Sequence, residues 1–132
     1  MEDNHIRDDR ARTFAARLRK FEQDSDPSNL VELFADDAIT QRFDARGERK
    51  GEVQQFWTEY RGQFDEVRTS FYNVIEGQDE FALGWTSEGT LSNGRPLHYR
   101  GVTCLGYEGD TIAWLRTYYD SAVFAPPTAE QR

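Results

Sequence analysis

Two spacings of apolar residues divide the chain into an N-terminal and a C-terminal part. In the N-terminal part, apolar residues recur at intervals of three and four, which predicts one helix over about residues 7–23 and another after Gly51. Between these helices, Pro27 and the apolar residues that follow it predict a short helix, and residues 35–43 predict a strand. The charged stretch 47–51, GERKG, is expected to be a loop. The two long helical stripes comprise Ala11, Phe14, Ala15, Leu18 and Phe21, and then Val53, Phe56, Trp57, Tyr60 and Phe64.

After Gln63 the apolar residues alternate with other residues, and this period of two predicts four β-strands over about 67–76, 80–91, 96–107 and 111–124. Short turns separate the strands. Asn93-Gly94 indicates a hairpin, because both residues tolerate positive φ. Helices followed by consecutive strands predict an α+β fold in which the helices pack on one face of a mainly antiparallel sheet.

The last predicted strand carries large side chains on both of its faces. In residues 114–120, WLRTYYD, one face has Trp114, Arg116 and Tyr118, and the other has Leu115, Thr117 and Tyr119. A sheet with one solvated face alternates apolar with polar residues. We therefore expect both faces of this strand to be covered.

Composition narrows the classes of partner. The 132 residues suit a single domain, expected over residues 1–125 and followed by a mobile tail at 126–132. A formal net charge of −8 makes nucleic acid and membrane surfaces unfavourable partners. One Cys and two His are too few for a Cys/His zinc site, so we expect no metal and no cofactor. A charged N-terminus and the lack of a long apolar run predict a cytoplasmic protein.

Five short motifs together resemble a known family. They are LFADDA at 33–38, the glycine at 51 that opens a helix, NGRP at 93–96, EGDTI at 108–112 and RTYYD at 116–120. Their order and spacing resemble the SnoaL-like branch of the NTF2-like superfamily, which includes ketosteroid isomerase, limonene-type epoxide hydrolases and polyketide cyclases. The resemblance spans about residues 14–120. It implies a cystatin-like, cone-shaped roll in which a curved sheet wraps three helices and leaves an apolar pocket at its open end.

The resemblance also assigns side chains to the two faces of the sheet. In such folds the concave face lines the core and pocket, and the convex face often forms a dimer. The matched positions place Leu115, Thr117 and Tyr119 inward. The same alternation places Thr86 and Glu88 inward and Ser87 outward. The residues expected to form a homodimer also point outward. Those dimer residues are Trp85, Trp114 and Tyr118.

Matched to ketosteroid isomerase, the chain lacks the required groups. That enzyme uses an Asp base and an oxyanion hole formed by a Tyr and a protonated Asp. The matching positions are Arg42 for the base, and Thr103 and the vicinity of Leu18 for the hole. An Arg cannot accept a proton at neutral pH, and a Leu cannot donate one. Steroid isomerisation by this mechanism is therefore not expected.

The other two activities of the branch depend on Glu88. Limonene-type hydrolases use an Asp–Arg–Asp set, which matches Thr86, Glu88 and Thr117, so only one carboxylate remains. Polyketide cyclases need a single base that removes a proton from an acidic carbon, and Glu88 can fill that role. The alternative is a solvated or ion-paired Glu88. Arg42 is either a rim residue or a buried charge that needs a partner.

The sequence thus predicts a cofactor-independent acid–base enzyme of isomerase or cyclase type that acts on a small, mostly apolar molecule. A non-catalytic ligand-binding or dimeric interaction module is the alternative, and an epoxide hydrolase is a second one. The candidate catalytic residues are Glu88 and Arg42. The candidate substrate-binding residues are Phe14, Leu18, Trp57, Tyr60, Thr86, Tyr99, Thr103, Leu115, Thr117 and Tyr119.

Overall fold

The helices of the chain come first and most of its strands come last. A computed structural model describes residues 6–44 and 47–125, with the backbone alone at 44 and 47–51. The predicted tail, residues 126–132, lies outside the described residues. In order, the elements are α1 Asp9–Asp24, α2 Ser28–Val31, β1 Phe34–Asp44, β2 Gly47–Gly51, α3 Val53–Gly62, β3 Phe64–Glu76, β4 Glu80–Leu91, β5 Pro96–Glu108, β6 Thr111–Tyr119 and the 3-10 helix η1 Ser121–Phe124.

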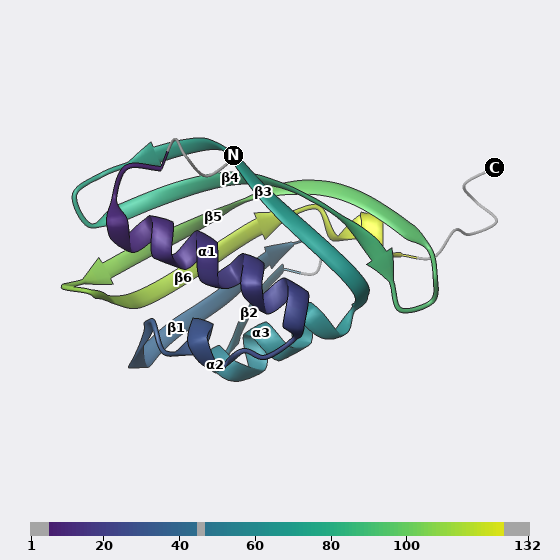
Figure 1. Cartoon of the computed structure of the whole chain (residues 1–132), viewed down its shortest axis with the longest axis horizontal. Coiled ribbons are helices and arrows are strands. Elements are labelled where there is room, and N and C mark those ends of the chain that lie inside the picture. The colour runs from purple at the N-terminus through teal and green to yellow at the C-terminus, as the bar shows by residue number, and fades with distance from the viewer. Residues whose placement is uncertain (1–5, 45–46, 126–132) are drawn as a thin grey trace.

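The strands form one mixed sheet in the order β2-β1-β6-β5-β4-β3. All neighbouring pairs are antiparallel except β1 and β6, which run parallel. Figure 1 shows the long strands curving around α1, with α2 and α3 on the same side of the sheet. This arrangement confirms the predicted α+β fold with three helices packed into a curved sheet.

Two elements differ from the sequence-based prediction. Residues 47–51 form the short edge strand β2, paired with β1, instead of a loop. Charged residues are common on edge strands, because they discourage pairing with another chain. The last strand ends at Tyr119, and Asp120 then caps η1 by accepting a hydrogen bond from the Ala122 N–H at 2.9 Å.

Helix α1 buries its predicted apolar stripe against the sheet and α3. Phe14 packs against Trp57 and Phe71, with ring centroids 6.1 and 6.5 Å apart. The stripe continues through Leu18 and Phe21 to Glu22, which is only 2% exposed. A charged residue therefore occupies a core position at the C-terminal end of this helix.

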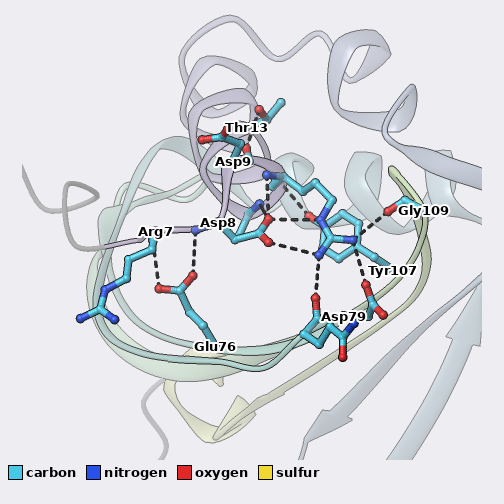
Figure 2. A network of polar contacts seen from close by, with 11 residues as sticks. Arg7, Asp8, Asp9, Thr13, Glu76, Asp79, Tyr107 and Gly109 are labelled. Atoms are coloured by element: carbon cyan, nitrogen blue, oxygen red, sulfur yellow. Dashed lines mark hydrogen bonds and ion pairs between the residues drawn. The ribbon is translucent and has the colours of Figure 1, made fainter.

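The N-terminal end of α1 is held by a cluster of polar contacts. Asp8 is the N-cap and accepts from the backbone N–H groups of Arg10 and Ala11 at 2.8 and 3.3 Å. The Arg10 guanidinium donates to Asp8, to Asp79 at 3.1 Å and to the Gly109 carbonyl at 2.8 Å. Figure 2 shows these partners gathered at one end of the molecule, where the β3–β4 and β5–β6 turns meet the helix.

The turn between β4 and β5 sets which side chains face inward. Leu91 pairs with Arg95 through a 2.8 Å hydrogen bond from the Leu91 N–H, and Gly94 has φ +91°. The loop therefore has three residues, whereas a two-residue loop centred on Asn93-Gly94 would pair residues 92 and 95. This one-residue difference places Trp85 opposite Gly101 and Glu88 opposite His98. It reverses the predicted facing of every side chain on this part of β4.

Side chains on the outer face of β6 stack on neighbours within the sheet, but Arg116 and Tyr118 stay exposed, so this face is not covered as expected. Tyr118 stacks on Phe43 with ring centroids 4.8 Å apart, and the Arg116 guanidinium lies 4.4 Å from the centroid of the Trp114 ring. The Trp114 indole also covers Gly106 so closely that a Cβ there has no room. No helix within the described residues is both long enough and apolar enough to cross a membrane.

Candidate functional site

An apolar cavity of about 50 Å³ lies between the helices and the concave face of the sheet. Ten of the twelve predicted site residues line it. These are Phe14, Leu18, Arg42, Trp57, Tyr60, Tyr99, Thr103, Leu115, Thr117 and Tyr119. Their roles toward a ligand stay predictions, but the structure brings their side chains to one wall.

The predicted inward placement of Glu88 and Thr86 is wrong. Glu88 is exposed, and it lines an open groove with Arg68 and His98 on the outer side of the sheet. The cause is the three-residue turn, which turns Trp85 and Ser87 inward in place of Thr86 and Glu88. Trp85 consequently lines the cavity and is not available to a dimer interface on the outer face.

A buried carboxylate was missed by the sequence-based reasoning. Glu22 accepts a hydrogen bond from the Tyr60 hydroxyl at 2.6 Å, from the Thr69 hydroxyl at 2.6 Å and from the Thr69 backbone N–H at 2.9 Å. The Thr69 and Ser87 hydroxyl oxygens lie 2.7 Å apart, and Ser87 donates when the Thr69 proton points to Glu22. Tyr60 and Thr69 line the cavity, so this cluster joins Glu22 to its wall.

The surroundings of Glu22 change how readily it takes up a proton. Burial raises the pKa of Glu22 above its ordinary value, while the hydrogen bonds from Thr69 and Tyr60 act in the opposite direction. Burial, together with the negative charge of Glu22, raises the pKa of Tyr60 well above its ordinary value. A carboxyl whose pKa moves toward neutrality is suited to give and take protons near physiological pH.

Arg42 lies on the cavity wall with its charge partnered. Its guanidinium donates to the Phe56 carbonyl and to Glu59 at 3.3 Å, and it lies 4.0 Å from the centroid of the Phe56 ring. Arg42 is on β1 beside Thr117 on β6, and its residue is 9% exposed. The structure therefore gives Arg42 the partner that a buried charge requires, and that partner is not Glu88.

Two tryptophans on the wall differ in their hydrogen bonds. The Trp85 indole N–H donates to the Thr103 hydroxyl at 2.9 Å, and Thr103 lies 3.0 Å from the Thr117 hydroxyl. The Trp57 indole nitrogen is buried and, among the described residues, has no hydrogen-bond acceptor. Trp57 is thus a donor whose capacity is unused within the described part of the protein.

The 3-10 helix η1 packs against one part of the wall. Phe124 lies with its ring centroid 5.1 Å from Tyr99 and 5.9 Å from Tyr119. Arg95, in the β4–β5 turn, donates to the carbonyls of Val123 and Ala125 at 3.2 and 3.0 Å. Burial raises the pKa of Tyr99 above its ordinary range, and the neighbouring Tyr119 adds to this effect.

Some of the residues missed at or beside the cavity wall left a signal in the sequence. Glu22 follows Ala15 and Leu18 at i+7 and i+4, so it continues the apolar stripe of α1 as a charged residue. Phe56 belongs to the apolar stripe of α3, while Thr69 and Phe71 alternate inward on β3. In the described part of the chain, no group of three or more His, Cys, Asp or Glu residues could hold a metal ion.

Comparison with known proteins agrees with this architecture. A family model described as a SnoaL-like domain matches residues 12–115. None of the curated proteins matches the chain. Among solved structures, an NTF2-like protein from Anabaena variabilis ATCC 29413 is 16% identical and superposes with a TM-score of 0.73, covering 83% of this chain and 86% of its own.

Two further structures carry small molecules. A protein from Catenulispora acidiphila with a ketosteroid isomerase-like fold, in complex with trimethylamine, is 16% identical at a TM-score of 0.71, covering 84% of this chain and 88% of its own. TerC, co-crystallised with polyporic acid, is 15% identical at a TM-score of 0.71, covering 87% and 92%. At these identities the likeness shows the fold alone. The family model matches most of this chain, so the chain belongs to the SnoaL-like domain family and has the NTF2-like fold.

Proposed function

We propose that the chain is a cofactor-independent acid–base enzyme of isomerase or cyclase type, acting on a small, mostly apolar molecule in the aromatic cavity. The observation that carries the proposal is the buried Glu22 carboxylate, hydrogen-bonded to the cavity-lining hydroxyls of Tyr60 and Thr69. A carboxyl kept in an apolar site has the raised pKa that general acid–base catalysis uses.

The proton would travel through Tyr60. A proton leaving a ligand carbon passes to the Tyr60 oxygen while the Tyr60 hydroxyl proton moves to Glu22, so the carboxylate gains the proton and the phenol stays neutral. The reverse transfer returns a proton to another ligand atom and completes an isomerisation or ring closure. Arg42 places a fixed positive charge on the same wall, which would stabilise negative charge that develops on the ligand.

The chemistry requires a ligand with an acidic C–H bond, and such bonds lie next to carbonyl groups. The test is therefore hydrogen–deuterium exchange of cyclopentanone in D2O, followed by proton NMR with and without protein. We expect the wild type to accelerate exchange, and both Glu22→Gln and Tyr60→Phe to reduce the acceleration at least about tenfold.

Glu88→Gln is the matched control, because it removes a carboxylate from the outer side of the sheet. It should exchange the ketone at the wild-type rate. Exchange no faster than in protein-free buffer, or an equal loss in Glu88→Gln, contradicts the proposal. The epoxide-hydrolase alternative has lost its support, since the single carboxylate on which it depended lies outside the cavity.

A non-catalytic binding module is the second candidate. Glu22 has three donors in place, which suits a settled structural cluster and favours this function. The cavity volume of about 50 Å³ is far below the roughly 300 Å³ at which pockets for drug-sized ligands begin, so it limits either function to a small ligand. Saturable binding of a small molecule without any exchange would favour this function.

We also propose a homodimer through the outer face of β1, β6 and β5, with Trp85 removed from the predicted interface. Ile39, Val102 and Tyr118 expose 50%, 39% and 43% of their surface on these adjacent strands. Tyr118→Glu should convert a dimer to a monomer in sedimentation velocity at micromolar concentration. Tyr72→Glu alters another exposed tyrosine, on β3, and serves as control. A wild type that sediments as a monomer contradicts the dimer.

A further inference from the structure

The cavity wall contains more hydrogen-bond donors than the described protein satisfies. The Trp57 indole can only donate, it is buried, and no described residue accepts from it. Buried donors normally have an acceptor, so an acceptor is missing from this wall.

Trp85 shows that the fold can satisfy an indole at this wall. Its N–H reaches the Thr103 hydroxyl at 2.9 Å, and its ring lies against Gly101, where a Cβ would come within 2.6 Å of the ring. Trp57 has aromatic neighbours instead, with ring centroids of Phe56 at 4.9 Å and Tyr60 at 5.9 Å. The difference between the two indoles is thus one of partner and not of burial.

We propose that the Trp57 indole N–H is the donor that recognises an oxygen acceptor on the ligand, which makes Trp57 a specificity-determining residue. The inference rests on the proposed function, since it assumes that the cavity takes a ligand. It adds the ligand's chemical class: a carbonyl compound whose oxygen binds Trp57.

The placement of Trp57 and Tyr60 fixes where the acidic C–H bond lies. The two residues are one helical turn apart on α3, and their ring centroids are 5.9 Å apart. A ligand oxygen at Trp57 and a C–H bond at Tyr60 are therefore a few ångströms apart, which suits a proton on the carbon next to the carbonyl. The donor on Trp57 would orient the carbon toward the group that takes its proton.

The test compares two probes of similar shape, cyclopentanone and methylenecyclopentane. The second has a methylene group where the first has its carbonyl oxygen. Titrations are followed by ¹H–¹⁵N NMR of the indole groups, with Trp85→Phe and Trp114→Phe used to assign the three signals. We expect the ketone to bind roughly tenfold more tightly than the hydrocarbon, as one neutral hydrogen bond provides. Its binding should move the Trp57 indole proton downfield and leave Trp114 unchanged.

Trp57→Phe keeps an aromatic ring and removes the N–H, so it should bind both probes about equally. Trp114→Phe is the matched control, because it removes an indole that does not line the cavity, and it should keep the preference for the ketone. If Trp57→Phe fails to fold, the wild-type indole shifts alone decide the matter.

Four outcomes are distinct. A ketone preference lost only in Trp57→Phe supports the inference. Equal binding of both probes, with Trp57 shifting no more than Trp85, overturns it and leaves a ligand cavity in place. No shift of any wall residue with either probe overturns the inference together with the proposed function. Ketone preference without hydrogen exchange leaves the inference standing and removes only the enzymatic function.

Discussion

The two ends of helix α1 each hold a carboxylate, and the carboxylates have opposite electrostatic settings. At the N-terminal end, Asp8 faces the Arg10 guanidinium and helix N–H groups near solvent, and its pKa is lowered. At the C-terminal end, Glu22 is buried beside the cavity among hydroxyl donors, and its pKa is raised. Asp8 is placed to stabilise the fold as an anion, whereas the burial of Glu22 is what the proposed proton exchange requires.

The pKa values of the two carboxylates are shifted by different causes, which distinguishes a stabilising carboxylate from a candidate functional one. The lowering of the Asp8 pKa comes first from its hydrogen bond with Arg10, and this cluster joins α1 to two turns of the sheet. The Glu22 pKa is raised chiefly by burial. Burying a carboxylate costs free energy, so a residue kept only for stability is seldom a buried carboxylate. A group that costs stability at neutral pH is the more informative about function.

The largest effect is expected from removing the Glu22 side chain. Glu22→Ala removes the acceptor of the Tyr60 hydroxyl and the Thr69 N–H, while the Thr69 hydroxyl can still donate to Ser87, and the change should cost about 3 kcal/mol in the free energy of unfolding. Glu22→Gln keeps one acceptor oxygen and should lose less. Urea unfolding of the three proteins measures this, and equal stability of all three would remove the distinction between the two ends of α1.

A smaller effect is expected at the other end of the helix. Asp8→Ala removes an N-cap and should cost about 1 kcal/mol. Asp8→Asn keeps the capping oxygen and removes the charge facing Arg10, so it should cost less than Asp8→Ala. The same urea series compares the two substitutions. A loss larger than that of Glu22→Ala would reverse the ranking of the two ends.

The pH dependence should have opposite signs at the two ends. The contribution of Asp8 is present above its ordinary pKa of 3.8 and is lost as pH falls through its lower folded pKa. The contribution of protonated Glu22 is present below 4.5 and is lost as pH rises through its higher folded pKa. Between pH 4.5 and neutrality, wild-type stability relative to Glu22→Gln should therefore fall, while stability relative to Asp8→Asn stays flat. A flat Glu22 profile over this range contradicts the raised pKa.

The smallest effect is expected from Glu76, which accepts from the backbone N–H groups of Arg7 and Asp8, both at 2.9 Å. Glu76→Ala should cost no more than about 0.5 kcal/mol, because Glu76 is only half-buried and water can replace the acceptor it removes. Amide exchange should reflect the same contrast: the Asp8 N–H exchanges early, and the Thr69 N–H bonded to Glu22 exchanges with global unfolding. Equal protection of the two amides would contradict it.

Element positions were predictable because periodicity depends on local sequence. The strand bounds 80–91 and the stripe of α1 follow from the pattern directly. The facing of β4 was not predictable in the same way, since it depends on whether the Asn93-Gly94 turn has two or three residues. The short strand β2 has charged residues and no alternating apolar ones, so only its pairing with β1 reveals it.

The candidate site was predicted in outline and missed at its centre. Ten wall residues follow from the resemblance and from alternation, but Glu88 was assigned the role that we now propose for Glu22. Glu22 depends on contacts with Tyr60 and Thr69, which are 38 and 47 residues away in sequence. The only local indication in the sequence is a carboxylate within an apolar helical stripe, because such a carboxylate is buried and needs hydrogen-bond donors from elsewhere in the fold.

The three tryptophans occupy the two sides of one sheet, and this gives the protein built-in optical reporters. Trp57 and Trp85 line the cavity, whereas Trp114 lies on the outer face beneath Arg116. A molecule entering the cavity changes the emission of the first two, and association through the outer face changes that of the third. Single-tryptophan variants can therefore separate ligand uptake from self-association by fluorescence alone, without any attached dye.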